Sequence, residues 1–378
     1  MTTTDWSLSE TDVLSRVGDA LADDRDDVLA TVIDVEGSAY RRPGAKMLIR
    51  PDDTAGSITA GCLEDEVARV GGEVRESGEP RIETYDLTGG DDALWGHGMG
   101  CNGIITVLLE PVDERHRPVV ETVAAHEPVA VATVVGGAGT VGERAWYRPD
   151  EGFAGGLDEQ IREALAGPAA ELLGDGGADV VEVETDDGPI EVFVDGIDVP
   201  PHLVVLGSGP DVVPVVDLAK RVDFRVSVVS FRGARANRER FPGADAVLSS
   251  SPAALGDDLS FDDETYVVVM THNFVDDGLA LETLLDTRVP YIGLMGPRER
   301  FEELREEFDD EVSMTGEDVE RVHTPIGLDL GGDSPYEVAY SIVGEVLAVA
   351  NGRSSGHLSA RAGPIHDRRD LDAGVAPE

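Results

Sequence analysis

Short apolar runs alternate with amphipathic stretches in the second half of the chain. Runs this short suit strands buried on both faces, whereas the stretches between them have apolar positions at helical spacing. The predicted strands lie at residues 203–206, 225–229, 246–248, 266–270 and 291–294, and the clearest helices at residues 212–221 and 277–285. Strands and helices in this order indicate a parallel sheet with helices on both sides.

The first half of the chain gives a mixed pattern. Apolar residues at helical spacing predict helices within residues 7–25 (with Ser7 or Ser9 as cap), 62–70 and 157–173. Strands are expected at residues 28–35, 45–50, 81–85, 103–109, 129–135, 179–184 and 190–194. Two glycines and the Pro200-Pro201 pair within residues 186–201 are typical of a connection, so we expect the domain linker there.

These patterns divide the chain into four parts. We expect a mixed α+β domain at residues 1–115, an intermediate α+β segment with the linker at residues 116–198, an α/β domain at residues 199–362 and a frayed polar tail at residues 363–378. The predicted fold class is therefore α/β, with a C-terminal parallel sheet preceded by a mixed α+β domain.

Charge is the unusual feature of the composition. The 378 residues include 76 Asp and Glu but only 30 Lys and Arg, a net charge of −46, and only two of the basic residues are lysines. The carboxylates are spread through every segment, as in proteins from a high-salt cytoplasm of the haloarchaeal type, where salt screens their repulsion. The sequence has no basic patch of the size that nucleic acid or an anionic membrane requires, so we expect neither as a partner.

Cysteine content and hydropathy indicate a cellular compartment. Two cysteines in 378 residues are no disulfide framework, and the polar, acidic start of the sequence is unlike a signal peptide. No apolar run approaches the roughly 18 residues of a membrane span. We therefore expect a protein of the reducing cytoplasm.

A glycine-rich turn follows the predicted strand at residues 203–206. Its sequence at residues 207–210 is Gly-Ser-Gly-Pro, and glycines there allow backbone amides to approach a phosphate at a helix N-terminus. Such a turn is typical of Rossmann-like domains, although Val212 replaces the third glycine of their fingerprint and a turn without a ligand is the alternative. The next strand ends in Ser230 and Arg232 rather than in a carboxylate. Plain NAD is therefore disfavoured, while Arg232 could still serve a phosphate.

Other predicted strands of this domain also end in glycine or polar residues. His272 and Gly296 follow predicted strands, Arg298 and Arg300 come shortly after this glycine, and His323 stands further along the chain. Because parallel strands end at one edge of a sheet, where ligands bind, these residues are candidate ligand contacts. The two guanidiniums could bind an anion. The alternative interpretation is that they form surface ion pairs with neighbouring glutamates.

A loop in the first half is rich in cations. Arg41, Arg42 and Lys46 lie within six residues of a chain that has only 30 basic residues. This density suggests a second contact with an anion, and the alternative is a solvated loop with incidental charges.

Both cysteines stand in glycine-rich loops. Cys62 follows Gly61 at a predicted helix start, and Cys101 lies in the loop at residues 95–103, which also contains His97. A structural cysteine is most often a small buried hydrophobe within a strand or helix, so these positions favour a functional pair, and a helix start lowers the pKa of a thiol. The spacing does not fit a zinc site.

Seven distinctive stretches stand in a consistent order, at residues 37–47, 60–64, 95–103, 206–210, 271–273, 291–298 and 323–331. Together they resemble the XdhC/CoxI family of accessory proteins of molybdenum enzymes. The chain departs from the family pattern at Pro210, where His is expected, and at Asn102, where Gly is commoner. It also lacks an acidic residue at Ser230.

The resemblance implies a maturation factor rather than a catalyst. Such proteins bind the molybdenum cofactor, protect it and help to load its sulfurated form into the apoenzyme of a molybdenum hydroxylase, such as xanthine or carbon monoxide dehydrogenase. That apoenzyme and a cysteine desulfurase are the implied partners, and a homodimer is possible.

Thirteen residues are candidates for contact with the cofactor. They are Arg41, Arg42, Lys46, Cys62, Glu64, His97, Cys101, Gly207, Gly209, His272, Gly296, Arg298 and His323. Thiols are soft ligands, so we further hypothesise that Cys62 and Cys101 face the cleft between the domains and contact the metal or its terminal sulfur.

Two other functions fit part of the sequence. An NADP-dependent oxidoreductase would use Arg232 for the additional phosphate, but Val212 breaks the glycine fingerprint and no Tyr-x-x-x-Lys pair is present. An adaptor without a cofactor would only dock onto a molybdoenzyme.

Overall fold

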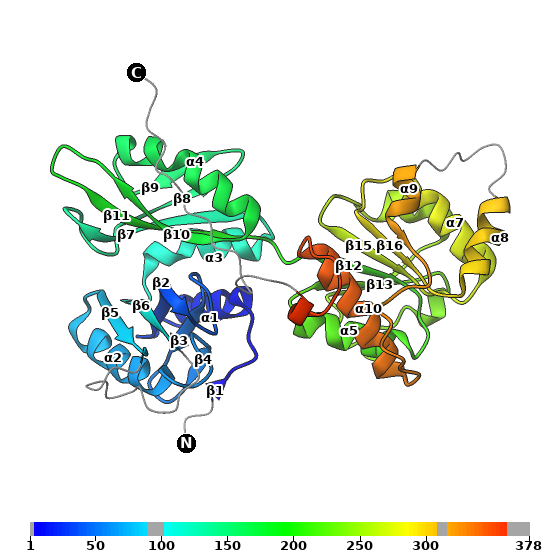
Figure 1. Ribbon diagram of the computed structural model, residues 1–378, viewed down its shortest axis with the longest axis horizontal. Helices are drawn as coiled ribbons and strands as arrows, with labels where there is room; N and C mark the ends of the chain where they lie inside the picture. Colours follow the sequence, from blue (N-terminus) through cyan, green and yellow to red (C-terminus); the bar gives the residue numbers. More distant parts are fainter. Residues whose placement is uncertain (1–3, 89–101, 308–315, 361–378) are drawn as a thin grey trace. The chain divides into compact units, whose positions relative to one another are not determined.

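The computed structural model describes residues 4–88, 102–307 and 316–360, and the chain forms two compact units (Figure 1). The first unit extends to Val199 and the second begins at Pro200. The linker expected at residues 186–201 is much shorter, because strand β11 (Ile190–Ile197) occupies most of that range. Gly196 lies inside the strand, where a Cβ would be 2.4 Å from the Leu172 carbonyl oxygen. This glycine therefore serves close packing and not a flexible connection.

The first of two sheets in the N-terminal unit has six strands. Their order is β1-β4-β3-β2-β6-β5, and every pair is antiparallel except the two-residue β1 with β4. The strands are β1 (Thr4–Asp5), β2 (Val28–Ser38), β3 (Lys46–Ile49), β4 (Thr54–Gly56), β5 (Arg81–Asp86) and β6 (Asn102–Pro111). Helix α2 (Glu64–Ser77) packs on one face and helix α1 (Glu10–Ala22) on the other. Ser9, one of the two expected caps, closes a capping box on α1.

The second sheet of this unit has five antiparallel strands in the order β10-β11-β7-β8-β9. They are β7 (Val129–Gly137), β8 (Arg144–Arg148), β9 (Gly152–Gly155), β10 (Ala178–Val183) and β11. Helix α4 (Glu159–Asp175) covers one face. A 3-10 turn, η1 (Glu114–His116), and helix α3 (Arg117–Ala124) connect the two sheets. We did not predict β8, β9 or α3, each of which has eight residues or fewer.

Apolar contacts join the two sheets of the first unit. Ile33 and Leu108 of the first sheet pack against Val135 and Phe193 of the second. This contact is interrupted by several buried charged residues, which are described below. The two sheets therefore share an interior that is partly apolar and partly ionic.

The second unit is built on a six-stranded sheet whose neighbours are all parallel, in the order β14-β13-β12-β15-β16-β17. The strands are β12 (His202–Leu206), β13 (Arg225–Ser230), β14 (Ala246–Ser249), β15 (Thr265–Val269), β16 (Tyr291–Leu294) and β17 (Val322–His323). Helices α5 (Val212–Arg221) and α10 (Pro335–Ala350) cover one face, and α7 (Phe274–Leu285) and α8 (Arg298–Glu307) the other (Figure 1). The predicted fold class is confirmed.

Shorter helical elements complete this unit. They are the 3-10 turns η2 (Gly233–Arg235), η3 (Arg238–Arg240), η4 (Pro252–Ala254) and η5 (Leu358–Ala360), and the helices α6 (Leu255–Asp258) and α9 (Gly316–Glu320). None of the helices that the structure describes combines the length and the apolar character needed to cross a membrane.

The strand order reverses at β12. From this strand the chain moves outward through α5 to β13 and β14, and it then returns to β15 on the other side of β12. The loops that follow β12 and β15 therefore lead to helices on opposite faces of the sheet. Open α/β sheets bind ligands at such a switch point, at the carboxyl ends of the strands.

Two adjacent glycines in α2 provide a test of how tightly this helix packs on β3. A Cβ at Gly71 would lie 2.6 Å from Cδ1 of Ile49, whereas a Cβ at Gly72 has no neighbour within 4 Å. Gly72→Ala should raise the free energy of unfolding by about 0.5–1 kcal/mol through helix propensity. Gly71→Ala should lower it, because overpacking costs about 1–3 kcal/mol. Urea unfolding measures both, and an equal effect of the two changes would contradict this packing.

Candidate functional site

The Gly207 turn connects β12 with α5 and leaves no room for a side chain. A Cβ at position 207 would lie 2.6 Å from the carbonyl oxygen of Met270, which follows the neighbouring strand β15. The Gly207 amide donates a hydrogen bond of 3.0 Å to the carbonyl of Val229 in β13. The turn is thus held between both neighbours of β12, at the switch point of the sheet.

Internal hydrogen bonds fix the rest of the turn. The Ser230 hydroxyl, at the end of β13, lies 2.9 Å from the buried Ser208 hydroxyl, and Arg240 donates a 2.8 Å bond to the Ser208 carbonyl. Ser230 is fully buried. The end of β13 therefore presents no carboxylate towards the turn, as the sequence indicates.

His272 pairs with Asp211 across the switch point. Its Nε2 lies 2.7 Å from Oδ2 of Asp211, a residue of the loop after β12, while His272 itself follows β15. The backbone of His272 has a φ of 60°, in the left-handed region that non-glycine residues adopt at a cost of about 1–3 kcal/mol. The imidazole remains more than half exposed. Asp211 was not predicted, since it lies 61 residues away from its partner.

The arginines after β16 have different environments. Arg300 forms a 2.5 Å ion pair with the buried Asp277, which also accepts a hydrogen bond from Thr271. Gly296, with a φ of 132°, makes room for this side chain, because a Cβ there would lie 2.7 Å from Cδ of Arg300. Arg298 is exposed at the start of α8 and forms no ion pair with any residue that the structure describes.

His323 belongs to a hydrogen-bonded group around Glu345. Its Nδ1 lies 3.5 Å from Oε1 of Glu345, and its ring stacks on the buried Tyr291 with centroids 4.5 Å apart. The Tyr291 hydroxyl and the Gly327 amide donate bonds of 2.7 and 2.8 Å to Glu345. Burial opposes ionisation of Glu345, but these donors outweigh it and lower its pKa. Burial and the neighbouring carboxylate raise the pKa of Tyr291 well above its usual value.

The candidate residues of the second unit thus share one edge of the sheet. Gly207 and Gly209 follow β12, His272 follows β15, Gly296 and Arg298 follow β16, and His323 ends β17. Arg232, the residue considered for an NADP phosphate, is ion-paired with Asp276 at 2.6 Å.

The candidate cations of the first unit are separated by the fold. Lys46 is buried, and its ammonium donates to the Gly44 carbonyl, to Asp195 at 2.5 Å and to Glu10. This is not the environment expected of an anion-binding lysine. The partners lie 36 and 149 positions away, so no local pattern shows them. Arg41 and Arg42 stay at the surface of the loop between β2 and β3.

Glu64 stabilises the loop that carries Cys62. Its buried carboxylate accepts hydrogen bonds from the Thr59 amide and hydroxyl, at 2.8 and 2.6 Å, and from the Leu63 amide at 3.2 Å. Cys62 is partly exposed just before α2. His97 and Cys101 lie outside the described residues. Among the described ones, no three or more His, Cys, Asp and Glu side chains are grouped to hold a metal ion.

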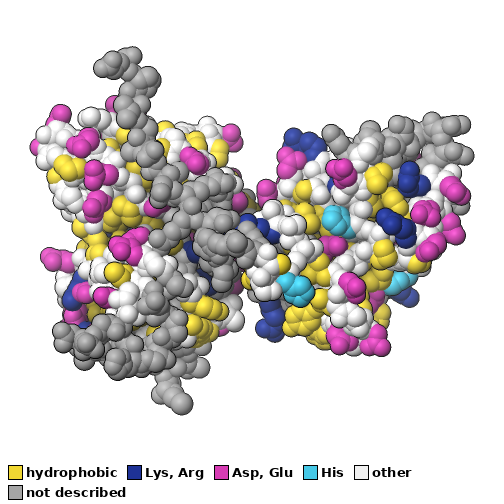
Figure 2. Space-filling model, in the orientation of Figure 1, with side chains coloured by type: hydrophobic (Ala, Val, Ile, Leu, Met, Phe, Trp, Pro, Cys, Tyr) yellow, Lys and Arg dark blue, Asp and Glu magenta, His cyan; other side chains and the backbone are white. Residues whose placement is uncertain are grey.

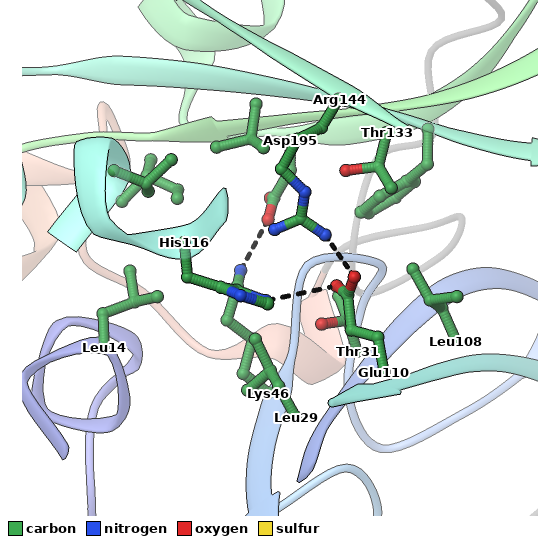
Figure 3. A pocket seen from close by; sticks show the side chains of 14 residues that line it. Leu14, Leu29, Thr31, Lys46, Leu108, Glu110, His116, Thr133, Arg144 and Asp195 are labelled. Carbon is green, nitrogen blue, oxygen red and sulfur yellow. Dashed lines mark hydrogen bonds and ion pairs between the residues drawn. The ribbon is translucent and has the colours of Figure 1, made fainter. Parts of the chain in front are cut away.

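A second group of charges lies near Lys46 and was not predicted. Figure 3 shows Arg144 of β8 reaching Glu110 at the end of β6, with His116 beside it. The His116 Nε2 lies 3.6 Å from Glu110. These residues and the Lys46–Asp195 pair line a cavity of about 40 Å³, which has room for a water molecule or two. Together with Glu10, which pairs with Lys46, these five residues form what we call the inter-sheet charge cluster: Glu10, Lys46, Glu110, His116, Arg144 and Asp195.

The members of this cluster shift one another's pKa. Burial opposes ionisation of Glu110, but Arg144 and His116 outweigh it and hold its pKa at about 2. Burial and Arg144 oppose protonation of His116, but Glu110 and Asp113 still raise its pKa. Burial and Asp195 raise the pKa of Glu10 to about 7 in spite of Lys46. One sequence signal exists, since Asp195 interrupts the apolar strand β11, but it does not identify a partner.

The fold and these positions define a protein with an N-terminal two-sheet unit and a Rossmann-like unit whose candidate ligand residues lie along the carboxyl edge of its sheet. Residues 203–346 match the family described as XdhC Rossmann domain, and residues 20–86 match the XdhC and CoxI family. The chain belongs to the XdhC/CoxI family.

Two proteins similar to this chain are named for xanthine dehydrogenase, and a third has no assigned function. A probable xanthine dehydrogenase subunit of Bacillus subtilis is 29% identical over 334 residues, 87% of this chain and 95% of that protein. The uncharacterized protein YqeB of Escherichia coli is 27% identical over 53% of this chain, which spans 38% of YqeB. A crystal structure of a xanthine dehydrogenase from Bacillus halodurans superposes with a TM-score of 0.75 at 28% identity, covering 92% of this chain and 97% of that one.

Glu110 provides a test of the inter-sheet charge cluster. Glu110→Gln leaves Arg144 without its buried partner and should lower the free energy of unfolding at neutral pH by about 3–5 kcal/mol. A carboxylate with a lowered pKa stabilises the fold above its ordinary pKa, and this contribution is lost as the pH falls from about 4.5 towards 2. The difference between the two proteins should therefore shrink over that range in urea unfolding at constant ionic strength.

The exposed Glu114 is the matched control, because its carboxylate pairs with Arg117 at the surface. Glu114→Gln should change the stability by less than about 0.5 kcal/mol at either pH. A difference for Glu110→Gln that stays constant with pH would contradict the pairing.

Proposed function

We propose that this protein binds the molybdenum cofactor and aids its sulfuration and insertion into a molybdenum hydroxylase of the xanthine or carbon monoxide dehydrogenase type. The observation that carries the proposal is family membership over both units, since the two family matches lie at residues 20–86 and 203–346. A relative named as part of a xanthine dehydrogenase is matched over 95% of its length, which supports a client of that type.

The carboxyl edge of the second unit suits the phosphate of the cofactor. The Met270 carbonyl excludes a side chain at Gly207 and keeps the turn compact, and glycine turns of this kind allow backbone amides to approach a phosphate. Arg298 is exposed beside Gly296 and has no ion pair within the described chain, which leaves its fork of donors for a phosphate. His272 and His323 would flank the ligand on the neighbouring strands.

The loops of the first unit suit the metal end of the cofactor. The cofactor supplies a sulfur-coordinated molybdenum, for which a thiol is a soft partner. Cys62 is partly exposed, and Glu64 fixes the loop behind it. Together with Cys101 and His97 it would receive that end, with Arg41 and Arg42 as surface cations for anionic groups.

The role implies partners and conditions. The apoenzyme of the hydroxylase would receive the cofactor, and a cysteine desulfurase would supply sulfur. The protein would act in the cytoplasm, and two chains could form a homodimer. Figure 2 shows Asp and Glu side chains spread over the visible face of both units. This distribution favours a high-salt cytoplasm, so binding is best measured at high potassium chloride.

Purification without air tests the proposal. Molybdenum, measured by mass spectrometry, and pterin, measured by fluorescence after oxidation, should copurify with the full-length protein in equal amounts. Cys62→Ser with Cys101→Ser should lose the metal and fail to activate the apoenzyme. A protein that carries neither component would be an adaptor, and a double variant that binds and delivers normally would end the thiol hypothesis.

Two arginines of α8 provide a matched comparison for the phosphate contact. Arg298 stands at the first position of the helix and Arg305 in its last turn, and both are exposed. Arg298→Gln should weaken the binding of the cofactor by at least roughly tenfold and so reduce the pterin that copurifies, since one charge-assisted contact is worth about 1.5–3 kcal/mol. Arg305→Gln should leave it unchanged. Equal retention by both variants would remove Arg298 from the site.

A further inference from the structure

The segment after β13 concentrates positive charge in a strongly acidic chain. Four arginines stand within nine residues, at positions 232, 235, 238 and 240, although the whole chain has only 30 basic residues and a net charge of −46. The segment forms the two 3-10 turns η2 and η3. Such a cluster attracts anions even against the field of the surrounding protein.

This arginine segment, residues 232–240, is tied to the Gly207 turn. Arg240 donates through Nη2 to the Ser208 carbonyl at 2.8 Å and through Nη1 to the Arg235 carbonyl at 3.4 Å. Its guanidinium thus links the middle of the segment to the turn after β12. The segment follows β13, which pairs directly with β12, so both lie at the carboxyl edge of the sheet.

Two of the four guanidiniums remain available. Arg232 is ion-paired with Asp276, and Arg240 is engaged with backbone carbonyls. Arg235 and Arg238 are exposed and form no ion pair with any described residue. The segment contains one carboxylate, Glu239, whose charge opposes but does not balance the four arginines. The Ser249 hydroxyl lies close to Gly233 and adds a neutral donor.

The end of β13 defines the chemistry of the ligand. In dinucleotide-binding folds a carboxylate at this place binds the free ribose hydroxyls, and that carboxylate would repel a phosphate on the ribose. Here Ser230 stands at that end, fully buried, with its hydroxyl directed to Ser208 and not to a ligand. A small internal residue followed by arginines accommodates a ribose phosphate.

We propose that the second unit binds a nucleotide that carries a 5′-phosphoryl group and an additional monophosphate on its ribose. The 5′-phosphoryl group lies at the Gly207 turn, and Arg235 and Arg238 hold the ribose monophosphate. The proposal rests on this unit alone, but it uses the same Gly207 turn as the phosphate of the proposed cofactor, so the two ligands would compete for that turn. Each proposal can fail without the other, because one is tested by added nucleotides and the other by the metal and pterin that copurify.

Calorimetric titration of the full-length protein with three small nucleotides tests the site. Adenosine 2′,5′-bisphosphate or adenosine 3′,5′-bisphosphate should bind at least roughly tenfold more tightly than AMP, as expected for one added charge-assisted contact. The advantage should decrease as salt is raised. The preferred isomer identifies the source, since NADP carries a 2′-phosphate and coenzyme A a 3′-phosphate. Equal affinities for all three nucleotides, or no binding, would overturn the proposal.

Paired variants assign the contact to the two arginines. Arg235→Gln with Arg238→Gln should reduce the affinity for the preferred bisphosphate to that for AMP and leave AMP binding unchanged. Arg288→Gln with Arg305→Gln is the control, because it removes the same charge from exposed positions of the same unit, and Arg288 precedes β16 at the opposite edge of the sheet. Retained discrimination in the first variant, or an equal loss in the control, would contradict the assignment.

Discussion

The parallel pairing of β12 with both β13 and β15 is the constraint on which the candidate site depends. It places the Gly207 turn between two neighbouring strands, with the Met270 carbonyl too close for any Cβ. It also sends the loops after β12 and β15 to opposite faces, where Asp211 and His272 meet across the switch point. A ligand at this edge contacts backbone first, and side chains from several strands then decide which ligand it is.

The first unit depends on a different kind of contact. Its two sheets meet through a few apolar residues and through the inter-sheet charge cluster, in which each cation has a carboxylate partner. Buried ion pairs contribute little net stability because desolvation offsets their attraction, but the loss of one partner is costly. Lys46, which sequence alone associates with an anion at the surface, is committed to this interior role.

Because the chain is so acidic, an exposed arginine without a carboxylate partner is a candidate contact for an anionic ligand. The sequence has 76 acidic residues, and several arginines of the described chain are paired with carboxylates, as Arg300 is with Asp277 and Arg232 with Asp276. Arg298, Arg235 and Arg238 are among the arginines without an ion pair in the described residues, and all three lie at or near the carboxyl edge of one sheet. Phosphate groups are the ligands that such forks of donors bind best.

The sequence by itself determined the layers of the fold and the edge at which ligands would bind. Helix α5 was predicted at residues 212–221 and has these bounds, because apolar periodicity and glycine turns are local properties of a chain. The same argument placed His272, Gly296 and Arg298 after the ends of parallel strands, whereas the strand that ends at His323 is seen only in the structure. The order of seven motifs identified the family without any information on three-dimensional contacts.

Only the tertiary structure decided which side chains are committed to one another. The Lys46–Asp195 pair spans 149 positions and the His272–Asp211 pair 61, and no local pattern encodes either. The structure shows that the Glu64 carboxylate stabilises the loop of Cys62. Gly196 lies in a strand and packs against a helix, and Arg240 donates a hydrogen bond to the Gly207 turn. The periodicity of apolar residues determines whether each segment forms a helix or a strand. The partner of a buried charge depends instead on how segments that are distant in the chain pack together.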